Sequence, residues 1–358
     1  MAIVHNPQDA KAPYYLGNLF YDKRQYQEAI SYWESSIKID SSFPQVLRNL
    51  GIACFNKQGD HQKAKTYLEQ AHALDPDDDR ISMELHQLYK RLNYAPEQRF
   101  KFLEENQESV LGRDDLYLEW VAVHNFLSDH EGALQLIMSR QFHPWEGGEG
   151  KASGQYVYSL LHLAKKHIYN ENYLEAISLL TRAQVYPHNL GEGKLYGTQE
   201  NDIFYWIGCA YAGLGNAQKA EDSFLKATEG LDEPSAAMFY NDQQPDKIFY
   251  QGLAWGKLGK DQQAEQIFQK LINYGTSHMN DVVKLDYFAV SLPNLLIFEE
   301  DLDAANRAHC YYLQGLGLFG LGKMEHAKEA FLKTLEIDSE HQGAKSHLDW
   351  VQSQLINQ

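Results

Sequence analysis

The sequence predicts an all-α protein in which pairs of helices stack into a solenoid, and three observations carry the prediction. A set of apolar and small residues returns after 34 residues, as from Gly17 to Gly51. In later copies a small residue is followed at helical spacing by a large apolar one. A further glycine, such as Gly215 or Gly322, stands where the first helix of a pair has to end and the chain reverses.

Three copies toward the C-terminus show the pattern most clearly. In each, an alanine follows a glycine after 12 residues and a phenylalanine follows after 4 more: Gly208, Ala220, Phe224; Gly252, Ala264, Phe268; Gly315, Ala327, Phe331. Small side chains at helix crossings let two backbones approach closely. Because a glycine inside a helix costs up to about 1 kcal/mol relative to alanine, its repeated use indicates a packing requirement. The 34-residue period is that of the tetratricopeptide repeat (TPR), so we predict a TPR-type α–α superhelix.

Weaker copies in the middle of the chain bring the expected total to about eight helix pairs. The distance from Val121 to Ala164 is 43 residues and that from Ala164 to Gly208 is 44, so loop insertions are expected here. After Asp338, apolar residues at steps of four, three and four predict a last amphipathic helix that caps the solenoid. These residues are Ala344, Leu348, Val351 and Leu355.

We expect one continuous solenoid over residues 1–358, divided by the character of its repeats. Its parts are N-terminal repeats at 1–112, central repeats at 113–247, C-terminal repeats at 248–338 with a long insert at 273–305, and a capping helix at 339–358. The first repeat begins within the first dozen residues without a cap before it. We therefore expect an upstream segment to cover that end.

Charge and cysteine content narrow the expected partners. The chain carries 32 Lys and Arg against 49 Asp and Glu, a net charge of −17. Such a surface repels phosphate backbones and anionic lipids, so no nucleic acid or membrane partner is predicted. The widely spaced Cys54, Cys209 and Cys310 argue against a disulfide framework or a zinc site and favour a cytoplasmic protein without a metal or other cofactor.

Two inserts in the central repeats share the pattern Pro-x-x-x-Gly-Glu-Gly-Lys. One starts at Pro144 and the other at Pro187. Glycines expose backbone N–H groups, lysines near helix starts attract anions, and aromatic rings stack on flat or sugar-like ligands. A saccharide or small-anion site is one interpretation, with these candidate residues: His143, Trp145, Glu146, Glu149, Lys151, Tyr186, His188, Asn189, Glu192 and Lys194. The other interpretation is structural: the glycines shape turns, Glu149 and Glu192 cap neighbouring helices, and the lysines pair internally.

A second candidate surface is the concave face that the first helices of TPR proteins line. Its candidate residues for a peptide groove are Tyr14, Asn18, Tyr21, Arg48, Asn49, Tyr205, Phe249 and Tyr312. Some TPR domains hold a peptide's terminal carboxylate with Lys and Asn residues; Asn18 and Asn49 match two of those places. Tyr14 and Glu84 stand where basic residues belong, which argues against that clamp. The aromatic residues are equally consistent with packing between adjacent first helices.

The long insert contains the apolar run Leu295-Leu296-Ile297-Phe298. Folded over the repeats as a strap it would bury these residues, whereas exposed it would be a docking patch. Motifs of hydrolases and redox enzymes, such as His-Glu-x-x-His, Cys-x-x-Cys or Gly-x-Ser-x-Gly, are absent from the sequence, so an enzyme is not predicted.

Longer strings carry a more specific resemblance than the repeat pattern does. They read HPWEGGEGK at 143–151, NLGEGK at 189–194, NDQ at 241–243 and DYFAVSLP at 286–293. Over essentially its whole length the chain resembles the C-terminal TPR region of large bacterial proteins whose N-terminal part is a β-rich domain of unknown function. That domain is similar to sugar-binding sandwiches of the aldose-epimerase type. The resemblance implies a link to carbohydrate metabolism and an upstream domain next to the first repeat.

The predicted function is a non-catalytic protein–protein interaction scaffold that binds a protein segment or its own upstream domain. The alternative is a saccharide or small-anion binding module that uses the two Gly-Glu-Gly-Lys loops.

Overall fold

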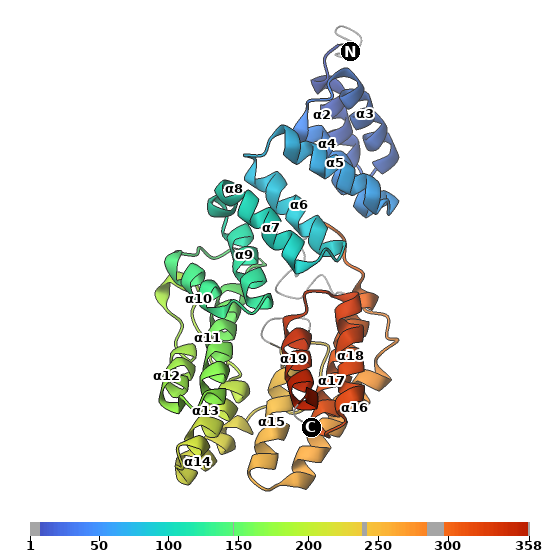
Figure 1. The fold of residues 1–358 in the computed structure, drawn as a ribbon. Coiled ribbons are helices and arrows are strands. Elements are labelled where there is room, and N and C mark those ends of the chain that lie inside the picture. The colour runs from blue at the N-terminus through green and yellow to red at the C-terminus, as the bar shows by residue number, and fades with distance from the viewer. Residues whose placement is uncertain (1–7, 146, 238–241, 285–296, 357–358) are drawn as a thin grey trace. The chain divides into compact units, whose positions relative to one another are not determined.

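The computed structural model describes residues 8–145, 147–237, 242–284 and 297–356. Within these ranges the regular structure consists of helices, and no β-strand occurs (Figure 1). The predicted all-α fold of stacked TPR-type helix pairs is confirmed. None of the described helices combines the length and the apolar character needed to span a membrane.

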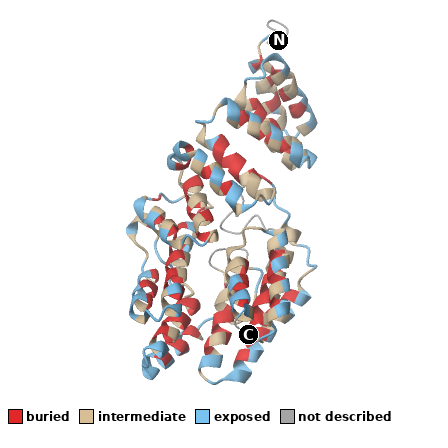
Figure 2. Cartoon of the chain, in the orientation of Figure 1, coloured by how far each residue is buried: buried red, intermediate tan, exposed pale blue. Residues whose placement is uncertain are grey.

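The α-carbon contacts divide the chain into two compact units. Unit 1 consists of residues 1–120 with 294–300, and unit 2 consists of residues 121–293 with 301–358. Figure 2 shows buried residues along the helices of each unit. A short segment from late in the sequence therefore belongs to the N-terminal repeats.

Unit 1 is built from short helices in chain order. They are α2 (Lys11–Asp22), α3 (Tyr26–Ile39), α4 (Pro44–Ala53), the π-helical turn η1 (Cys54–Gln58), α5 (His61–Leu74), α6 (Asp79–Arg91), α7 (Pro96–Glu105), α8 (Gln107–Gly112) and the start of α9 (Asp114–Phe126). Helix α2 packs on α3, and α4 packs on α5. Buried Ala29 and Ala64 stand at the predicted small-residue positions of the second helices.

Unit 2 continues the same arrangement of pairs. After the end of α9 come α10 (His130–Ser139), α11 (Lys151–Tyr169), α12 (Tyr173–Ala183), the 3₁₀ turn η2 (His188–Leu190), α13 (Asn201–Gly213), α14 (Ala217–Ala227), α15 (Pro245–Lys257), α16 (Asp261–Ser277), α17 (Leu302–Gly320), α18 (Met324–Ile337) and α19 (Gln342–Ile356). The pairs α11–α12, α13–α14, α15–α16 and α17–α18 pack closely.

The glycines of the repeat pattern lie where a first helix crosses its partner. A Cβ atom built on Gly208, Gly252 or Gly315 would lie 2.5 Å from a ring carbon of the phenylalanine four residues after the matching alanine. That distance is shorter than van der Waals contact allows, so each crossing requires a residue without a side chain. The expected role of the small residues is thereby confirmed.

The turn between the two helices of a pair uses left-handed backbone as expected. Gly215 and Gly322 both have φ of 72°, and each follows the C-cap of a first helix. This conformation lets the chain reverse within a few residues.

The long insert is shorter than its predicted bounds of 273–305. Helix α16 continues to Ser277 and α17 begins at Leu302, so both helices extend into the predicted insert. Its residues 285–296, including Leu295 and Leu296, lie outside the described residues. Phe298 has only 1% of its surface exposed, so the interpretation of the run as a buried strap holds for that residue.

Candidate functional site

A pocket with a volume of about 460 Å³ opens in unit 1. Its wall comes from α2, α3, α4 and η1, with one residue from the late segment. The lining residues are Asn18, Tyr21, Asp22, Trp33, Arg48, Asn49, Ile52, Asn56 and Ile297. The wall therefore combines three side-chain amides with aromatic and aliphatic surface.

The Asn18 amide is held at the centre of the α2–α3–α4 packing. Its Oδ1 atom accepts hydrogen bonds from Trp33 Nε1 at 3.0 Å and from Asn49 Nδ2 at 3.1 Å. With its oxygen fixed by two donors, the amide has one orientation. Within the described residues its Nδ2 group makes no hydrogen bond, so two N–H donors are available at the pocket wall.

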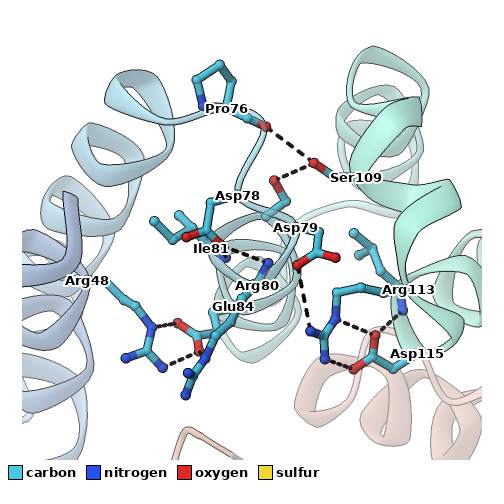
Figure 3. Close-up of polar contacts among 12 residues, drawn as sticks. Arg48, Pro76, Asp78, Asp79, Arg80, Ile81, Glu84, Ser109, Arg113 and Asp115 are labelled. Carbon is cyan, nitrogen blue, oxygen red and sulfur yellow. Dashed lines mark hydrogen bonds and ion pairs between the residues drawn. The ribbon is translucent and has the colours of Figure 1, made fainter.

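The charge of Arg48 is compensated inside unit 1. Its Nε and Nη2 atoms bind the carboxylate of Glu84, whose side chain is fully buried (Figure 3). Arg80 Nε binds the same carboxylate at 3.0 Å, while Arg48 Nη1 donates to Asn49 Oδ1 at 3.0 Å. A two-pronged pair of this kind occupies Nε and Nη2 of Arg48, and Asn49 occupies Nη1, so these donors are already engaged when a ligand's carboxylate arrives. The pairing of Glu84 with Arg48 is the physical reason why a clamp for a peptide's terminal carboxylate does not fit this site.

A second group of arginine and carboxylate contacts lies at the start of α6 and α9, also drawn in Figure 3. Arg113 binds Asp115 through Nε at 2.9 Å and Nη2 at 2.8 Å, and its Nη1 lies 3.8 Å from Asp79 Oδ1. The hydrogen bond to Asp115 raises the pKa of Arg113. These contacts join the start of α9 to the start of α6.

Tyr21 gives the pocket an aromatic wall with a polar end. Its ring lies 5.4 Å from that of Trp33. Burial raises the pKa of Tyr21, although nearby Lys57 acts in the opposite direction. The phenol therefore stays protonated at neutral pH.

Asn56 is positioned by the only π-helical turn among the described helices. This turn ends at Gly59, whose φ is 65°. A π-helical turn changes the direction of side chains relative to a regular helix and is frequent at functional sites. Asn56 Nδ2 donates to the carbonyl of Ile297 at 2.6 Å, and the backbone N–H of Glu299 donates to Asn56 Oδ1 at 2.9 Å. We call residues 297–300 the strap.

The predicted groove residues fall into two groups. Asn18, Tyr21, Arg48 and Asn49 line the pocket, and Tyr14 lies beside it, where its carbonyl accepts from Trp33 Nε1 at 3.3 Å. By contrast, Tyr205, Phe249 and Tyr312 are buried within unit 2. Their rings contact the phenylalanines of the repeat pattern, with Phe249 5.8 Å from Phe268 and Tyr312 6.0 Å from Phe331. For these three residues the packing interpretation holds.

The two Gly-Glu-Gly-Lys inserts contact each other. The carbonyl of Asn189 accepts from the backbone of Phe142 at 2.8 Å, and Asn189 Nδ2 binds the last carbonyls of α10 at Ile137 and Arg140. Glu192 accepts from the backbone N–H groups of Gly150 at 2.8 Å and Ser153 at 2.9 Å. The second loop thus caps the helix that follows the first loop.

Other candidates of the insert site also have internal roles. Lys194 binds Glu200 Oε1 at 2.6 Å and the carbonyl of Gln184 at 3.0 Å. The Trp145 ring covers Gly148, and burial raises the pKa of Tyr186. The exposed candidates are His143, Glu149, Lys151, His188 and Lys194; Glu146 lies outside the described residues. Because Glu192 holds the N–H groups that an anion would need, this geometry favours the structural interpretation of the loops.

Sequence reasoning missed five lining residues and the partner of the strap. The five are Asp22, Trp33, Ile52, Asn56 and Ile297, and Asn56 had no signal in the repeat pattern. The apolar run before Glu299 was visible, but no sequence feature pointed to its position 241 residues away beside Asn56. In the described part of the chain, no group of three His, Cys, Asp or Glu residues has a metal-binding arrangement.

Family comparisons match the repeats directly. Tetratricopeptide repeat models match residues 14–79, 202–229, 248–274 and 308–341. The chain therefore contains TPR repeats. The first match includes every residue that lines the pocket except Ile297.

Solved structures of repeat proteins are similar at low identity. YrrB, a TPR protein with an unusual peptide-binding site, is 15% identical over 63% of this chain and 88% of that chain, with a TM-score of 0.35. A TPR protein from Parabacteroides merdae is 15% identical over 73% and 91%, with a TM-score of 0.38. The yeast Sti1 TPR2AB domain, in its complex with pHSP90, is 12% identical in sequence over 96% of each chain, with a TM-score of 0.32.

Proposed function

We propose that this chain is a non-catalytic scaffold that binds an extended segment of a protein partner in the unit 1 pocket. One observation carries the proposal: the pocket wall presents side-chain amides at Asn18, Asn49 and Asn56 beside aliphatic surface from Ile52 and Ile297. Amides both donate to and accept from a peptide main chain, and apolar walls take its side chains. Asn56 makes this kind of contact with the strap backbone.

The charges at the pocket favour an internal peptide segment over a peptide's C-terminal carboxylate as the ligand. Glu84 and Asn49 occupy the donors of Arg48, and Asp22 adds an exposed carboxylate at the pocket. A ligand carboxylate would meet the charge of Asp22 and would find the donors of Arg48 already engaged. We therefore expect the bound part of the partner to be an internal segment.

The resemblance to large bacterial proteins suggests the first partner to test. An upstream domain of the same polypeptide would lie next to the first repeat, and a role in carbohydrate metabolism would follow from the nature of that domain. This part of the proposal rests on the resemblance of the strings at 143–151 and 286–293.

A random peptide library panned on the full chain tests the pocket. We expect enriched peptides to bind by fluorescence anisotropy and to lose affinity in the Asn18→Ala variant. One lost hydrogen bond of about 1 kcal/mol corresponds to a roughly fivefold weaker Kd. Asn273→Ala is the matched control, because Asn273 is exposed on α16 of unit 2. If the enriched peptides bind both variants equally, the pocket is not the binding site.

A further inference from the structure

The strap is held by contacts of three different kinds, all within unit 1. The first is to its main chain. Asn56 accepts from the N–H of Glu299 at 2.9 Å and donates to the carbonyl of Ile297 at 2.6 Å. One amide thus binds the backbone on both sides of Phe298, which is a contact that does not depend on the strap's side chains.

The second contact is an aromatic anchor. Phe298 is 1% exposed and packs against buried residues from η1, α5 and α6. Its ring meets that of Phe55 at 5.0 Å in an edge-on arrangement. The other buried members of this cluster are Cys54, Ala64, Leu68, Leu85 and Leu88. Unit 1 therefore has a slot for one aromatic side chain that its own N-terminal residues do not fill.

The third contact is a pair of ionic interactions after the anchor. Glu299 binds Lys57 of η1, and Glu300 lies 3.1 Å from Arg91 Nη1 at the end of α6. Lys57 also lies 4.9 Å above the ring of Tyr26. Two cations on different helices thus meet two consecutive carboxylates, which sets the direction of the segment in its site.

We propose that the surface formed by η1, α5 and α6 is a recognition site for a non-helical segment in which an aromatic residue is followed by two carboxylates. The chain's own strap occupies this site in cis. Helix packing alone does not require a side-chain amide to bind the backbone of a non-helical segment or two cations to match consecutive acids; recognition of a segment does. The site adjoins the pocket at Ile297 but does not depend on the pocket's having a ligand.

Occupation in cis determines how a partner competes. A tethered segment acts at an effective concentration on the order of millimolar, so a free segment of the same affinity binds the intact protein weakly. If the strap binds more weakly while the surface of η1, α5 and α6 stays unchanged, a free peptide can bind this surface and its affinity can be measured. Reversal of the two strap charges weakens the binding of the strap in this way, because it places lysines opposite Lys57 and Arg91.

The probe is a fluorescein-labelled peptide with the sequence of residues 295–302, LLIFEEDL. We expect it to bind the full-length Glu299→Lys/Glu300→Lys variant at least tenfold more tightly than the wild type, by fluorescence anisotropy at low salt. The matched control is Glu221→Lys/Glu265→Lys, which changes the net charge equally at exposed positions of α14 and α16. The control should bind the peptide as weakly as the wild type does.

Two peptide changes test the chemistry of recognition. A peptide with Phe298→Ala and one with both glutamates replaced by lysine should each lose at least tenfold in affinity for the strap variant. Equal binding of the original peptide to the wild type, the strap variant and the control would overturn the proposal. So would the absence of binding to the strap variant at millimolar peptide. If circular dichroism shows that the charge-reversal variant is unfolded, the Glu299→Gln/Glu300→Gln variant is used in its place. The same comparison of peptide affinities then tests the proposal.

Discussion

At the scale of single residues, the repeats depend on pairs in which one side chain fills the space that a glycine leaves. Gly252 and Phe268 show this most directly, because a Cβ on Gly252 would lie 2.5 Å from the Phe268 ring and 3.1 Å from Ile267 Cγ2. Both neighbours are buried and cannot move aside without disturbing the α15–α16 packing. The same helix carries a second glycine, Gly256, whose added Cβ would meet only Ala264 Cβ, at 4.0 Å.

This pair gives a matched prediction. We expect Gly252→Ala to lower the free energy of unfolding by about 1–3 kcal/mol, because overpacking exceeds the gain in helix propensity. We expect Gly256→Ala to raise it by up to about 1 kcal/mol, since only the propensity gain remains. Urea unfolding followed by circular dichroism measures both. Equal effects of the two substitutions would show that crossing distance does not explain the glycine pattern.

At the scale of elements, helix α19 does more than cap the last pair. It packs on α17 and α18, as a cap does, but its side chains also reach earlier first helices of unit 2. Trp350 lies 5.3 Å from the Trp206 ring of α13 and 5.0 Å from that of Phe319, and its ring is 5.2 Å from the ammonium of Lys165 on α11. Gln342 donates to the carbonyl of Ala122 at 3.1 Å.

The position of α19 explains a difference between expectation and structure. Phe249 and Tyr312 are candidates for a peptide groove by sequence, with packing as the alternative, and His347 of α19 lies 5.4 Å from the Phe249 ring and 5.9 Å from that of Tyr312. The sequence predicts an amphipathic last helix from Ala344, Leu348 and Val351. It does not predict the face on which this helix lies, because apolar periodicity defines a buried stripe and not its partner. The glycine crossings were predictable because both partners belong to one repeat.

Buried histidines at this interface make the docking of α19 sensitive to pH. Burial lowers the pKa of His347 to about 3, and the charge of Lys165 acts in the same direction. Burial also holds the pKa of His162 well below its usual value, and Ser346 of α19 lies 3.2 Å from His162 Nε2. The unfolded chain binds protons at these groups below pH about 6.5 while the folded chain does not. Stability is therefore complete above that pH and is lost as the pH falls toward the folded-state pKa values.

We expect the thermal midpoint to decrease as the pH is lowered from 7 to 5. Each such histidine lowers the free energy of unfolding by up to about 1.4 kcal/mol per pH unit below 6.5. Replacing His347 by Gln should reduce the slope of stability against pH by that amount. The His326→Gln variant is the control, because His326 is exposed on α18. Differential scanning calorimetry at pH 7, 6 and 5 measures the slopes. If the slope of stability against pH is unchanged in the His347→Gln variant, this histidine does not cause the pH dependence.

At the scale of the whole molecule, the two units are not simply the first and second parts of the sequence. The repeat pattern predicts a single array, whereas the α-carbon contacts define two units and assign residues 294–300 to the first. Contacts between residues more than 200 positions apart leave no periodic trace in a sequence. Asn56 and Phe298 were therefore unpredictable as neighbours, although Asn18 and Asn49 could be identified as pocket residues from their repeat positions.

Two buried phenylalanines test this assignment. Phe298 is 1% exposed in unit 1, and Phe331 is fully buried in unit 2. We expect Phe298→Ala to cost about 3–5 kcal/mol and to reduce hydrogen-exchange protection in α5 and α6, with α17 and α18 unchanged. The Phe331→Ala variant should show the reverse. Loss of protection in α17 and α18 on changing Phe298 would contradict the assignment of the strap to unit 1.

The late position of Phe298 has a consequence for biosynthesis. The ribosome makes Asn56 some 241 residues before Ile297, its partner in the strap. At about 5–20 residues per second, the N-terminal repeats wait for roughly 12–50 s with the slot for the aromatic side chain empty. During translation this slot is an apolar hollow next to two cations, open to any segment that emerges in the meantime or to a chaperone. The final packing of these repeats is thus set by a segment that is synthesised 241 residues after Asn56.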